Sequence, residues 1–201
     1  MTLLSNIAAI RKRARQHIEE GAVTPSYSAD KETVLKLLNE ALATEIVCVL
    51  RYRRHYFMAQ GLLAEAVKKE FLVHAEEEQA HADQIAERIV QLGGEPNFDP
   101  STLTERSHAE YAEGRDLEDM IKEDLIAERI AIESYREMIE YMAGRDHTTH
   151  RMLEGILAAE EEHAEEWASM LNDLHERLPR REPHANPQVN VRPKIKTAVG
   201  A

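Results

Sequence analysis

A short pattern of metal-ligating residues occurs twice in this sequence with the same surroundings. Glu78-Gln-Ala-His81 and Glu160-Glu-Glu-His163 each place a glutamate three residues before a histidine. An earlier acid precedes each copy at nearly the same distance, because Glu45 and Glu128 lie 33 and 32 residues before the first residue of the respective copies. A third match, Glu105-Arg-Ser-His108, has no acid 33 residues before it and is interpreted as chance. A chain that repeats Glu and then Glu-x-x-His in this way is constrained to bring four segments together.

The spacing within each copy predicts a metal site between helices. Residues three apart lie on the same face of an α-helix, one turn from each other. Each copy can therefore direct one carboxylate and one imidazole toward a single point, and the two earlier acids can add one oxygen donor to each of two cations. Carboxylate and imidazole donors suit iron or manganese, and this ligand set is typical of di-iron and di-manganese carboxylate bundles.

The rest of the chain favours an all-α fold. Glycine is scarce, proline is rare before the last quarter, and apolar residues recur at helical spacing in four long segments. These predict helices over about 31–60, 62–92, 117–143 and 147–178, with Asp146 or Thr148 as the cap of the last. The connection over 95–116 is long enough to cross from one end of a bundle to the other. The second and third helices should then be parallel, in an up-down-down-up arrangement.

The two ends of the chain differ from this central region. Residues 1–29 predict a short amphipathic helix over 1–20 and a linker; the helix carries a basic cluster of Arg11, Lys12, Arg13 and Arg15. Residues 30–178 form the predicted bundle, and residues 179–201 are a proline-rich, locally basic tail. Either end could contact DNA or a neighbouring subunit, although a docking helix with a solvated charged face and a flexible solvated tail are the simpler interpretations.

Charge, cysteine content and hydropathy limit the possible functions. The net charge of −12 argues against general attraction to nucleic acid and suits a protein that gathers cations. The single cysteine, Cys48, excludes an intrachain disulfide framework and any all-cysteine metal site. No apolar run is long enough to cross a membrane, and the N-terminus lacks the apolar core of a signal peptide. These features predict a cytoplasmic protein without a membrane partner.

Residues 36–175 resemble the bacterioferritin branch of the ferritin-like family. The similarity lies in the stretches 38–52, 78–83, 93–97, 124–128 and 156–163. The resemblance implies a ferritin-like four-helix bundle whose ferroxidase ligands are Glu45, Glu78, His81, Glu128, Glu160 and His163. It further implies that Glu45, Glu78 and His81 hold one iron, that Glu128, Glu160 and His163 complete the other, and that Glu78 and Glu160 bridge the two.

Two departures from the family change what is expected. Gln79 occupies the position at which typical bacterioferritins place a haem-ligating methionine, so haem b binding is not expected. The proline-rich tail replaces the short fifth helix that helps to close the family's cage, so the resemblance implies a homo-oligomer but not a closed shell of defined size. The N-terminal extension is similar to that of Dps-like ferritins with basic tails.

These features predict a ferroxidase that oxidises Fe(II) with O2 or H2O2, for iron storage or detoxification. Tyr52 lies two turns after Glu45 on nearly the same helical face, and is a candidate to hydrogen-bond a ligand or to supply an electron; a core tyrosine bonded to a helix carbonyl or a water is the alternative. Tyr135 lies at the equivalent position after Glu128.

Three other functions fit parts of the pattern. A di-manganese catalase uses a closely similar ligand set, and a Dps-like particle would hold DNA through its basic ends. A rubrerythrin-like peroxidase fits less well, because Cys48 alone cannot build its second iron site and Ala131 stands where that family repeats an acid. A metal-free bundle would have to bury Glu45 and Glu128 without compensation, which is costly.

Overall fold

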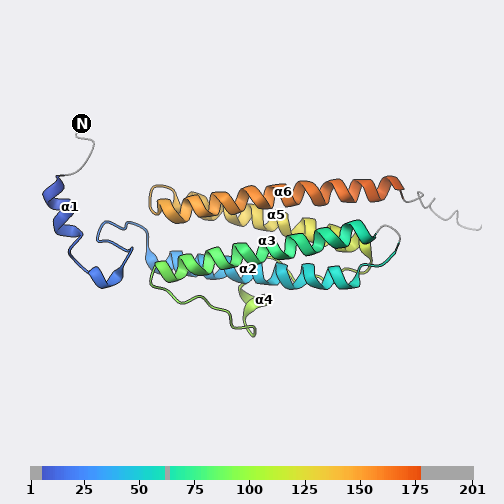
Figure 1. Ribbon diagram of the computed structural model, residues 1–201, viewed down its shortest axis with the longest axis horizontal. Coiled ribbons are helices and arrows are strands. Elements are labelled where there is room, and N and C mark those ends of the chain that lie inside the picture. Colours follow the sequence, from blue (N-terminus) through green and yellow to red (C-terminus); the bar gives the residue numbers. More distant parts are fainter. Residues whose placement is uncertain (1–5, 62–63, 178–201) are drawn as a thin grey trace, which may run out of the picture.

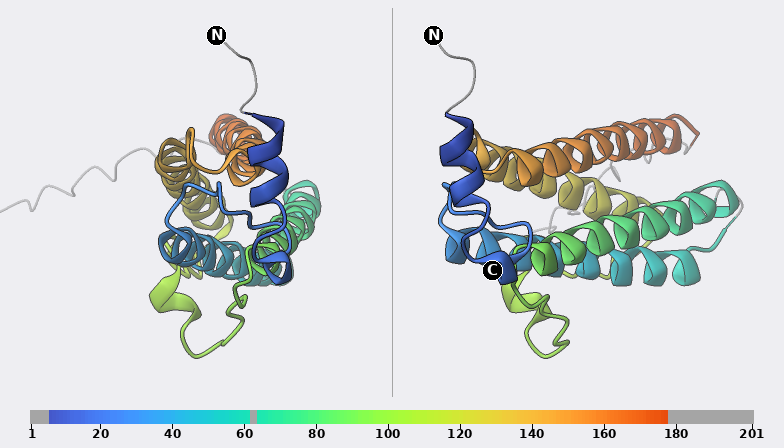
Figure 2. Two further views of the ribbon diagram at one scale, coloured as in Figure 1. Left: turned by 90° about the vertical axis from the view of Figure 1, so that its left-hand side faces the viewer. Right: turned by 60° about the vertical axis from the view of Figure 1, so that its left-hand side comes forward.

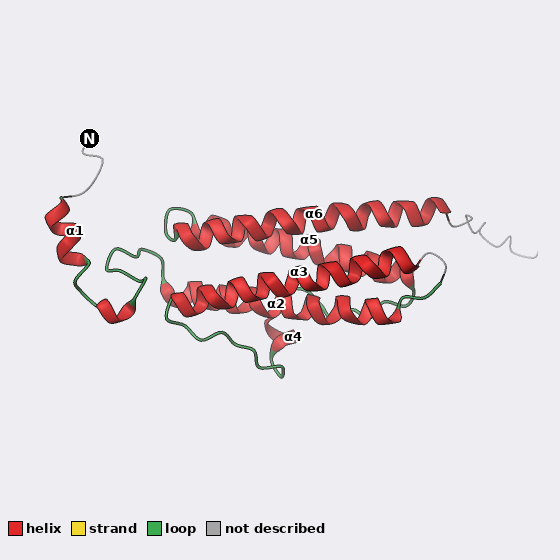
Figure 3. Cartoon of the chain, in the orientation of Figure 1, coloured by secondary structure: helices red, strands yellow, loops and turns green. Residues whose placement is uncertain are grey.

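Four long helices run side by side and form the body of the molecule (Figure 1). In the computed structural model, which describes residues 6–61 and 64–177, they are α2 (Lys31–Met58), α3 (Ala64–Gln91), α5 (Leu117–Met142) and α6 (His147–Arg177). Helix α2 pairs with α3 and α5 pairs with α6. The described residues contain helices, turns and loops and no strand (Figure 3), so the predicted all-α fold is confirmed.

The connection between α3 and α5 runs along the bundle and contains the short helix α4 (Leu103–Arg106), which packs on α2. Helices α3 and α5 therefore run in the same direction, while α2 and α6 run in the opposite one (Figure 1). This is the up-down-down-up arrangement that the length of the connection predicts. It places α2 and α5, which each carry one isolated acid, beside α3 and α6, which each carry one Glu-x-x-His.

The apolar core is divided into two main layers along the bundle. One layer includes Leu38, Leu42, Ile85 and Leu153, and the other includes Tyr52, Phe71, Ile121 and Trp167. On every long helix the acids and histidines of the repeated pattern lie between the residues of one layer and those of the other. The bundle thus holds a polar layer between two apolar ones.

Helix α3 ends at a pair of glycines in the way its sequence predicts. The N–H of Gly93 donates to the carbonyl of Val90, and the N–H of Gly94 donates to that of Ile89, which is the Schellman pattern of helix termination. Gly93 has a φ of 73°, a left-handed conformation that favours glycine. A Cβ atom at Gly94 would collide with the side chain of Leu35 on α2, so this turn also fixes how closely α3 approaches α2.

A buried polar network ties the crossing segment to the bundle. Asp124 accepts a hydrogen bond from Nε of Arg51 at 2.8 Å and contacts Nδ1 of His55 at 2.8 Å. Arg51 donates to the carbonyl of Glu110, and Nε2 of His55 lies 3.1 Å from the carbonyl of Ala112. The network joins α2, α5 and the crossover at one point, next to the polar layer.

The N-terminal helix is shorter than predicted. Helix α1 covers only Ile7–Arg13; the chain then turns through His17, which has a left-handed φ of 51°, and forms a 3₁₀ turn at Ile18–Glu20. Helix α1 lies beyond the end of the bundle at which α5 is joined to α6 (Figure 2), and Ile7 and Ile18 are 49% and 76% exposed. Because it buries no apolar face, packing supplies nothing to extend it. Leu3 and Leu4 lie outside the described residues.

The linker after α1 contacts the bundle more closely. The hydroxyl of Tyr27 donates to Asp146, the residue before α6, at 2.8 Å. Asp146 also accepts the backbone N–H of Thr149, so it caps α6 as one of the two predicted residues. The predicted basic tail over 179–201 lies outside the described residues. Among the helices that the structure describes, none is both long and apolar enough to cross a membrane.

Candidate metal centre

The structure brings the six acids and histidines of the repeated pattern together inside the bundle. Their ligand atoms form two overlapping groups, within each of which the atoms lie less than 4.8 Å apart. The first group is Glu45, Glu78, His81 and Glu160; the second is Glu78, Glu128, Glu160 and His163. All six are buried, with exposed fractions between 1% and 7%. Because Glu78 and Glu160 belong to both groups, they are placed to bridge two neighbouring ions.

Both histidines direct the same ring nitrogen into this cluster. Nδ1 of His81 lies 3.0 Å from Glu160, 3.2 Å from Glu78 and 3.6 Å from Glu45. Nδ1 of His163 faces Glu78, Glu128 and Glu160 at 3.6 to 3.9 Å. Each imidazole therefore faces three carboxylates, which come from three different helices in both cases.

Several polar atoms of the cluster have no hydrogen-bond partner although they are buried. They are Oε2 of Glu45, Oε1 of Glu78, Oε1 of Glu160 and Nδ1 of His163. A buried polar atom without a partner is costly, whereas a metal ion would give each of these atoms a bond. The charges agree with a pair of bound metal ions, since four carboxylates balance two divalent cations and the two imidazoles bind metals in their neutral form. The residues therefore fit a dinuclear site.

Burial and mutual contact change how these groups hold protons when no cation is bound. Burial, together with repulsion from Glu78 and Glu160, holds the pKa of Glu45 well above its usual range. Burial and repulsion from Glu160 do the same to the pKa of Glu128. Burial lowers the pKa of His81, but contacts with Glu160, Glu45 and Glu78 outweigh it and raise the value to about 12. When no cation is bound, protons held by these groups therefore compensate part of the negative charge of the cluster.

Two tyrosines reach the cluster from opposite sides. The Tyr52 hydroxyl, on α2, donates to Oε1 of Glu128 on α5, and the Tyr135 hydroxyl, on α5, donates to Oε1 of Glu45 on α2. Tyr52 itself accepts a hydrogen bond from Nε1 of Trp167 at 2.9 Å. Tyr52 therefore bonds a carboxylate of the cluster that belongs to the facing helix and not to its own.

Glu77 takes part in the site although the sequence places it on a solvated face. Its side chain is 51% exposed, yet Oε2 lies 3.0 Å from Nε2 of His163. A carboxylate can only accept there, so it holds the proton of His163 on Nε2 and leaves Nδ1 free to bind a cation. The sequence does not single out Glu77 as a contact of His163, because neighbouring acids in the polar run 76–79 look the same in the sequence.

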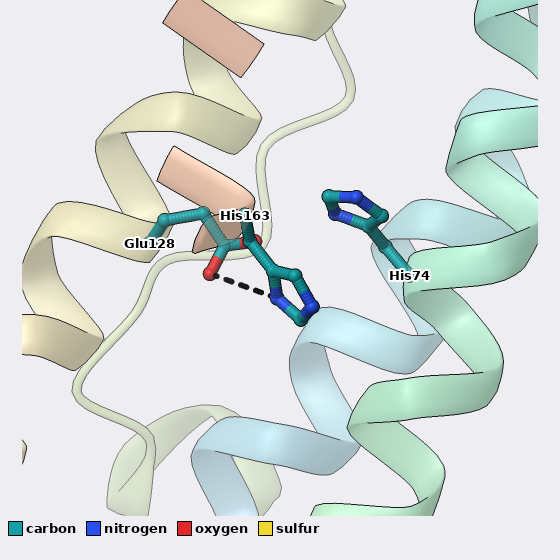
Figure 4. Close-up of side chains that lie close together, drawn as sticks. All are labelled: His74, Glu128 and His163. Atoms are coloured by element: carbon teal, nitrogen blue, oxygen red, sulfur yellow. Dashed lines mark ion pairs between the residues drawn. The ribbon is translucent and has the colours of Figure 1, made fainter. Parts of the chain in front are cut away.

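Three further residues near the cluster have no counterpart in the repeated pattern. His74 on α3 lies beside His163 and Glu128, with its ring centroid 4.2 Å from that of His163 (Figure 4). Together with Glu70 and Glu166, His74 forms a further group whose ligand atoms lie within 4.8 Å of one another. Glu70 and His74 lie four residues apart and so share a face of α3, but no spacing rule shows that Glu166 of α6 meets them.

Other residues considered from the sequence lie outside the cluster. Cys48 is buried, consistent with a small core residue, and burial raises the pKa of its thiol well above the usual range. Gln79 is exposed on α3 and donates to Asp83. The third Glu-x-x-His, Glu105 with His108, belongs to neither group of candidate ligands.

Comparison with known proteins gives consistent results. A family model described as a ferritin-like domain matches residues 35–177. The DNA protection during starvation protein of Pyrococcus furiosus is 34% identical over 146 residues, which are 69% of this chain and 76% of that protein. A bacterioferritin of Rhodobacter capsulatus is 28% identical over 149 residues, which are 72% of this chain and 86% of that protein.

Solved structures show the same architecture. A dodecameric thioferritin, the bacterioferritin-related protein of Bacteroides fragilis, superposes with a TM-score of 0.72 at 32% identity, and the match covers 74% of this chain and 90% of that one. The Dps of Thermosynechococcus elongatus has a TM-score of 0.68 at 23% identity, covering 70% and 91% of the two chains. The second likeness concerns the fold alone.

Proposed function

The chain belongs to the ferritin-like domain family, as its sequence indicates, and we propose that it is a di-iron ferroxidase that oxidises Fe(II) for iron storage or detoxification. The observation that carries this proposal is the pair of overlapping ligand groups joined by Glu78 and Glu160. The names of its relatives, bacterioferritins and starvation-protection proteins, agree with it.

The proposed ligands divide between two ions according to their contacts. Glu45 and His81 bind one Fe(II), Glu128 and His163 bind the other, and Glu78 and Glu160 bridge them. This division is supported by His81 facing Glu45 and by His163 facing Glu128. Two Fe(II) together supply the two electrons that, with two protons, reduce O2 to H2O2 or H2O2 to two waters.

The protein residues position the ions and hold the charge that develops. The carboxylates of Glu45 and Glu128 each accept a tyrosine hydroxyl on one oxygen, which leaves the other oxygen directed into the cluster. The two apolar layers above and below exclude bulk water, so the carboxylates act at low dielectric and favour the higher positive charge of the product ions. Tyr52, bonded between Trp167 and Glu128, is our candidate to supply an electron when fewer than two Fe(II) are present.

Aerobic addition of Fe(II) to the metal-free protein tests the proposal. We expect rapid oxidation of two Fe(II) per chain, followed by retention of ferric iron. Glu160→Ala should abolish this fast phase because it removes a ligand from both ions, while Glu162→Gln, an exposed change on the same helix, should leave it intact. Oxidation no faster than in buffer, or equal rates in both variants, would refute the proposal.

Metal content and the reaction with peroxide separate the di-manganese catalase from the ferroxidase. A catalase would contain manganese after purification and release O2 from peroxide without net oxidation of added Fe(II). The ligand set suits both metals, so metal analysis of the purified protein decides between them. Haem b is not among the proposed cofactors, because Gln79 occupies the position at which typical bacterioferritins place the haem-ligating methionine.

A second function is favoured by one observation, the exposed basic helix α1. Arg11, Lys12 and Arg15 are exposed beyond the end of the bundle, and the Pyrococcus furiosus relative is named for DNA protection. If copies of this chain assemble into a homo-oligomer, their α1 helices together would bind the duplex more tightly than one copy alone. Retardation of DNA that disappears at moderate salt and on deletion of residues 1–20 would support this function; retardation that persists after the deletion would contradict it.

A further inference from the structure

Three side chains between α3 and α6 form a metal-ligating group separate from the six. The group consists of Glu70, His74 and Glu166, whose ligand atoms lie within 4.8 Å of one another. Nε2 of His74 lies 2.9 Å from Glu166 and 4.0 Å from Glu70. One imidazole and two carboxylates are donors that suit a divalent transition-metal ion.

The histidine of this group has an unpartnered polar atom. His74 is fully buried, and its Nδ1 has no hydrogen-bond partner. Since Nε2 faces the two acids, Nδ1 is a second buried donor atom that the ring can offer to a cation. His74 packs at its edge against Trp167, with the ring centroids 4.7 Å apart, so it is fixed between the two acids and the interior.

The group connects solvent to the dinuclear cluster. The side chains of Glu166 and Glu70 are 42% and 28% exposed, whereas that of His74 is not exposed at all. His74 also forms a group with Glu128 and His163, in which the ligand atoms lie within 4.8 Å of one another (Figure 4). Donor atoms thus follow one another from the surface, through His74, to two of the six proposed ligands.

We propose that Glu70, His74 and Glu166 form a third divalent-cation site, through which ions enter the dinuclear cluster. The acids take the ion from solvent, and Nε2 of His74 becomes its third ligand. From there the ion passes to Glu128 and His163, beside which the ring of His74 lies. The binding of an ion at this site is independent of the proposed function, whereas its passage to the cluster rests on that function.

Binding is tested with Co(II), which is not oxidised by air under these conditions and reports its ligands through visible absorption. We expect three Co(II) per chain in the wild type and two in the double variant Glu70→Gln/Glu166→Gln, which leaves the buried His74 in place. The matched control Glu65→Gln/Glu165→Gln changes exposed acids on the same two helices and should keep three. Two Co(II) in the wild type, or three in the double variant, would overturn the proposal.

Passage is tested by the rate of Fe(II) oxidation at limiting Fe(II). The double variant should still oxidise two Fe(II) per chain but about tenfold more slowly, as is usual when groups next to a metal site are changed, while the control pair matches the wild type. An unchanged rate would overturn the entry role. Three bound Co(II) with no oxidation in the wild type would instead refute the ferroxidase and leave the third site standing.

Discussion

The Tyr52 hydroxyl donates to Glu128 on the facing helix. The equivalent tyrosine of the other half, Tyr135, donates in the same way to Glu45. The two hydrogen bonds therefore cross between α2 and α5, and each fixes one oxygen of an acid that has no Glu-x-x-His partner on its own helix. The side chain of a glutamate is long and flexible, so a glutamate with no second ligand on its own helix needs such a hydrogen bond to keep its carboxylate in one orientation.

Removing one of these hydroxyls should weaken the site without unfolding the bundle. Tyr52→Phe keeps the ring and its packing on Trp167, but frees Glu128 to rotate and leaves the indole N–H without its acceptor. We expect Co(II) affinity to fall about tenfold, in line with other groups that orient metal ligands. Titration followed by visible absorption measures the change. Tyr111→Phe, at an exposed position, is the control, and equal affinities in the two variants would contradict the role assigned to Tyr52.

Glu77 should matter more than its exposure suggests. Glu77→Gln can donate as well as accept, so it no longer holds the proton of His163 on Nε2. We expect Co(II) affinity to fall about tenfold, with a shift of the absorption bands that reports altered nitrogen ligation. Glu76→Gln, the neighbouring exposed acid, should bind as the wild type does. If both variants bind equally well, the tautomer of His163 is fixed by another group.

Much of the fold and of the cluster can be predicted from the sequence, because each rests on a periodicity. Apolar spacing gives the four helices, and the i, i+3 spacing of Glu78 with His81 places two donors on one face. Contacts between helices have no such rule. The polar run 76–79 is typical of a solvated face, yet Glu77 contacts His163, and the sequence does not indicate that Tyr52 contacts Glu128. Spacing along one helix does not reveal which residue of the next helix a side chain meets.

The end regions show the opposite limit. Ile7, Ile10 and Ile18 predict a longer docking helix, because apolar residues at helical spacing usually mark a buried face. The structure leaves these side chains at least 36% exposed, and α1 ends at Arg13. Apolar residues at helical spacing indicate that one face of a helix can be buried, but they do not indicate that another part of the protein covers that face.

Bound metal should stabilise the protein, and its removal should do the reverse. An ion that binds only the folded chain adds about 2.7 kcal/mol to the free energy of unfolding when it is present at 100 times its Kd. We therefore expect Tm to rise with added Mn(II) and to fall again with a chelator. Glu160→Ala should show little response, because it lacks a ligand shared by both ions. If the Tm of the wild type does not change when Mn(II) is added, a site for this metal in the cluster is excluded.

The network at Asp124 should be among the most sensitive points of the fold. Asp124→Ala leaves Arg51 and His55 buried without their carboxylate, and breaking one side of a buried ion pair costs about 3–5 kcal/mol. Urea unfolding of the metal-free protein measures this loss, and Asp83→Asn, on the exposed face of α3, should change stability little. A small loss at Asp124 would mean that water replaces the carboxylate.

Asp146 gives a prediction about pH. Burial alone would raise its pKa, but hydrogen bonds from Thr149, Tyr27 and Arg88 outweigh burial and lower it. Because the folded-state pKa lies below the unfolded value of about 3.9, the ionised carboxylate stabilises the fold at neutral pH. This contribution is lost as the pH falls through the folded-state pKa.

Asp146→Asn isolates this contribution, because asparagine still caps α6 but carries no charge for Arg88. We expect the variant to be less stable than the wild type by about 1–3 kcal/mol at pH 7, the usual cost of losing hydrogen bonds to a charged group. The difference should shrink as the pH falls below about 4, where the wild-type carboxylate also becomes neutral. Urea unfolding across this pH range measures it, with Asp173→Asn as an exposed control. A difference that stays constant down to the lowest pH would show that the geometry of Asp146, and not its charge, joins the linker at Tyr27 to α3 and α6.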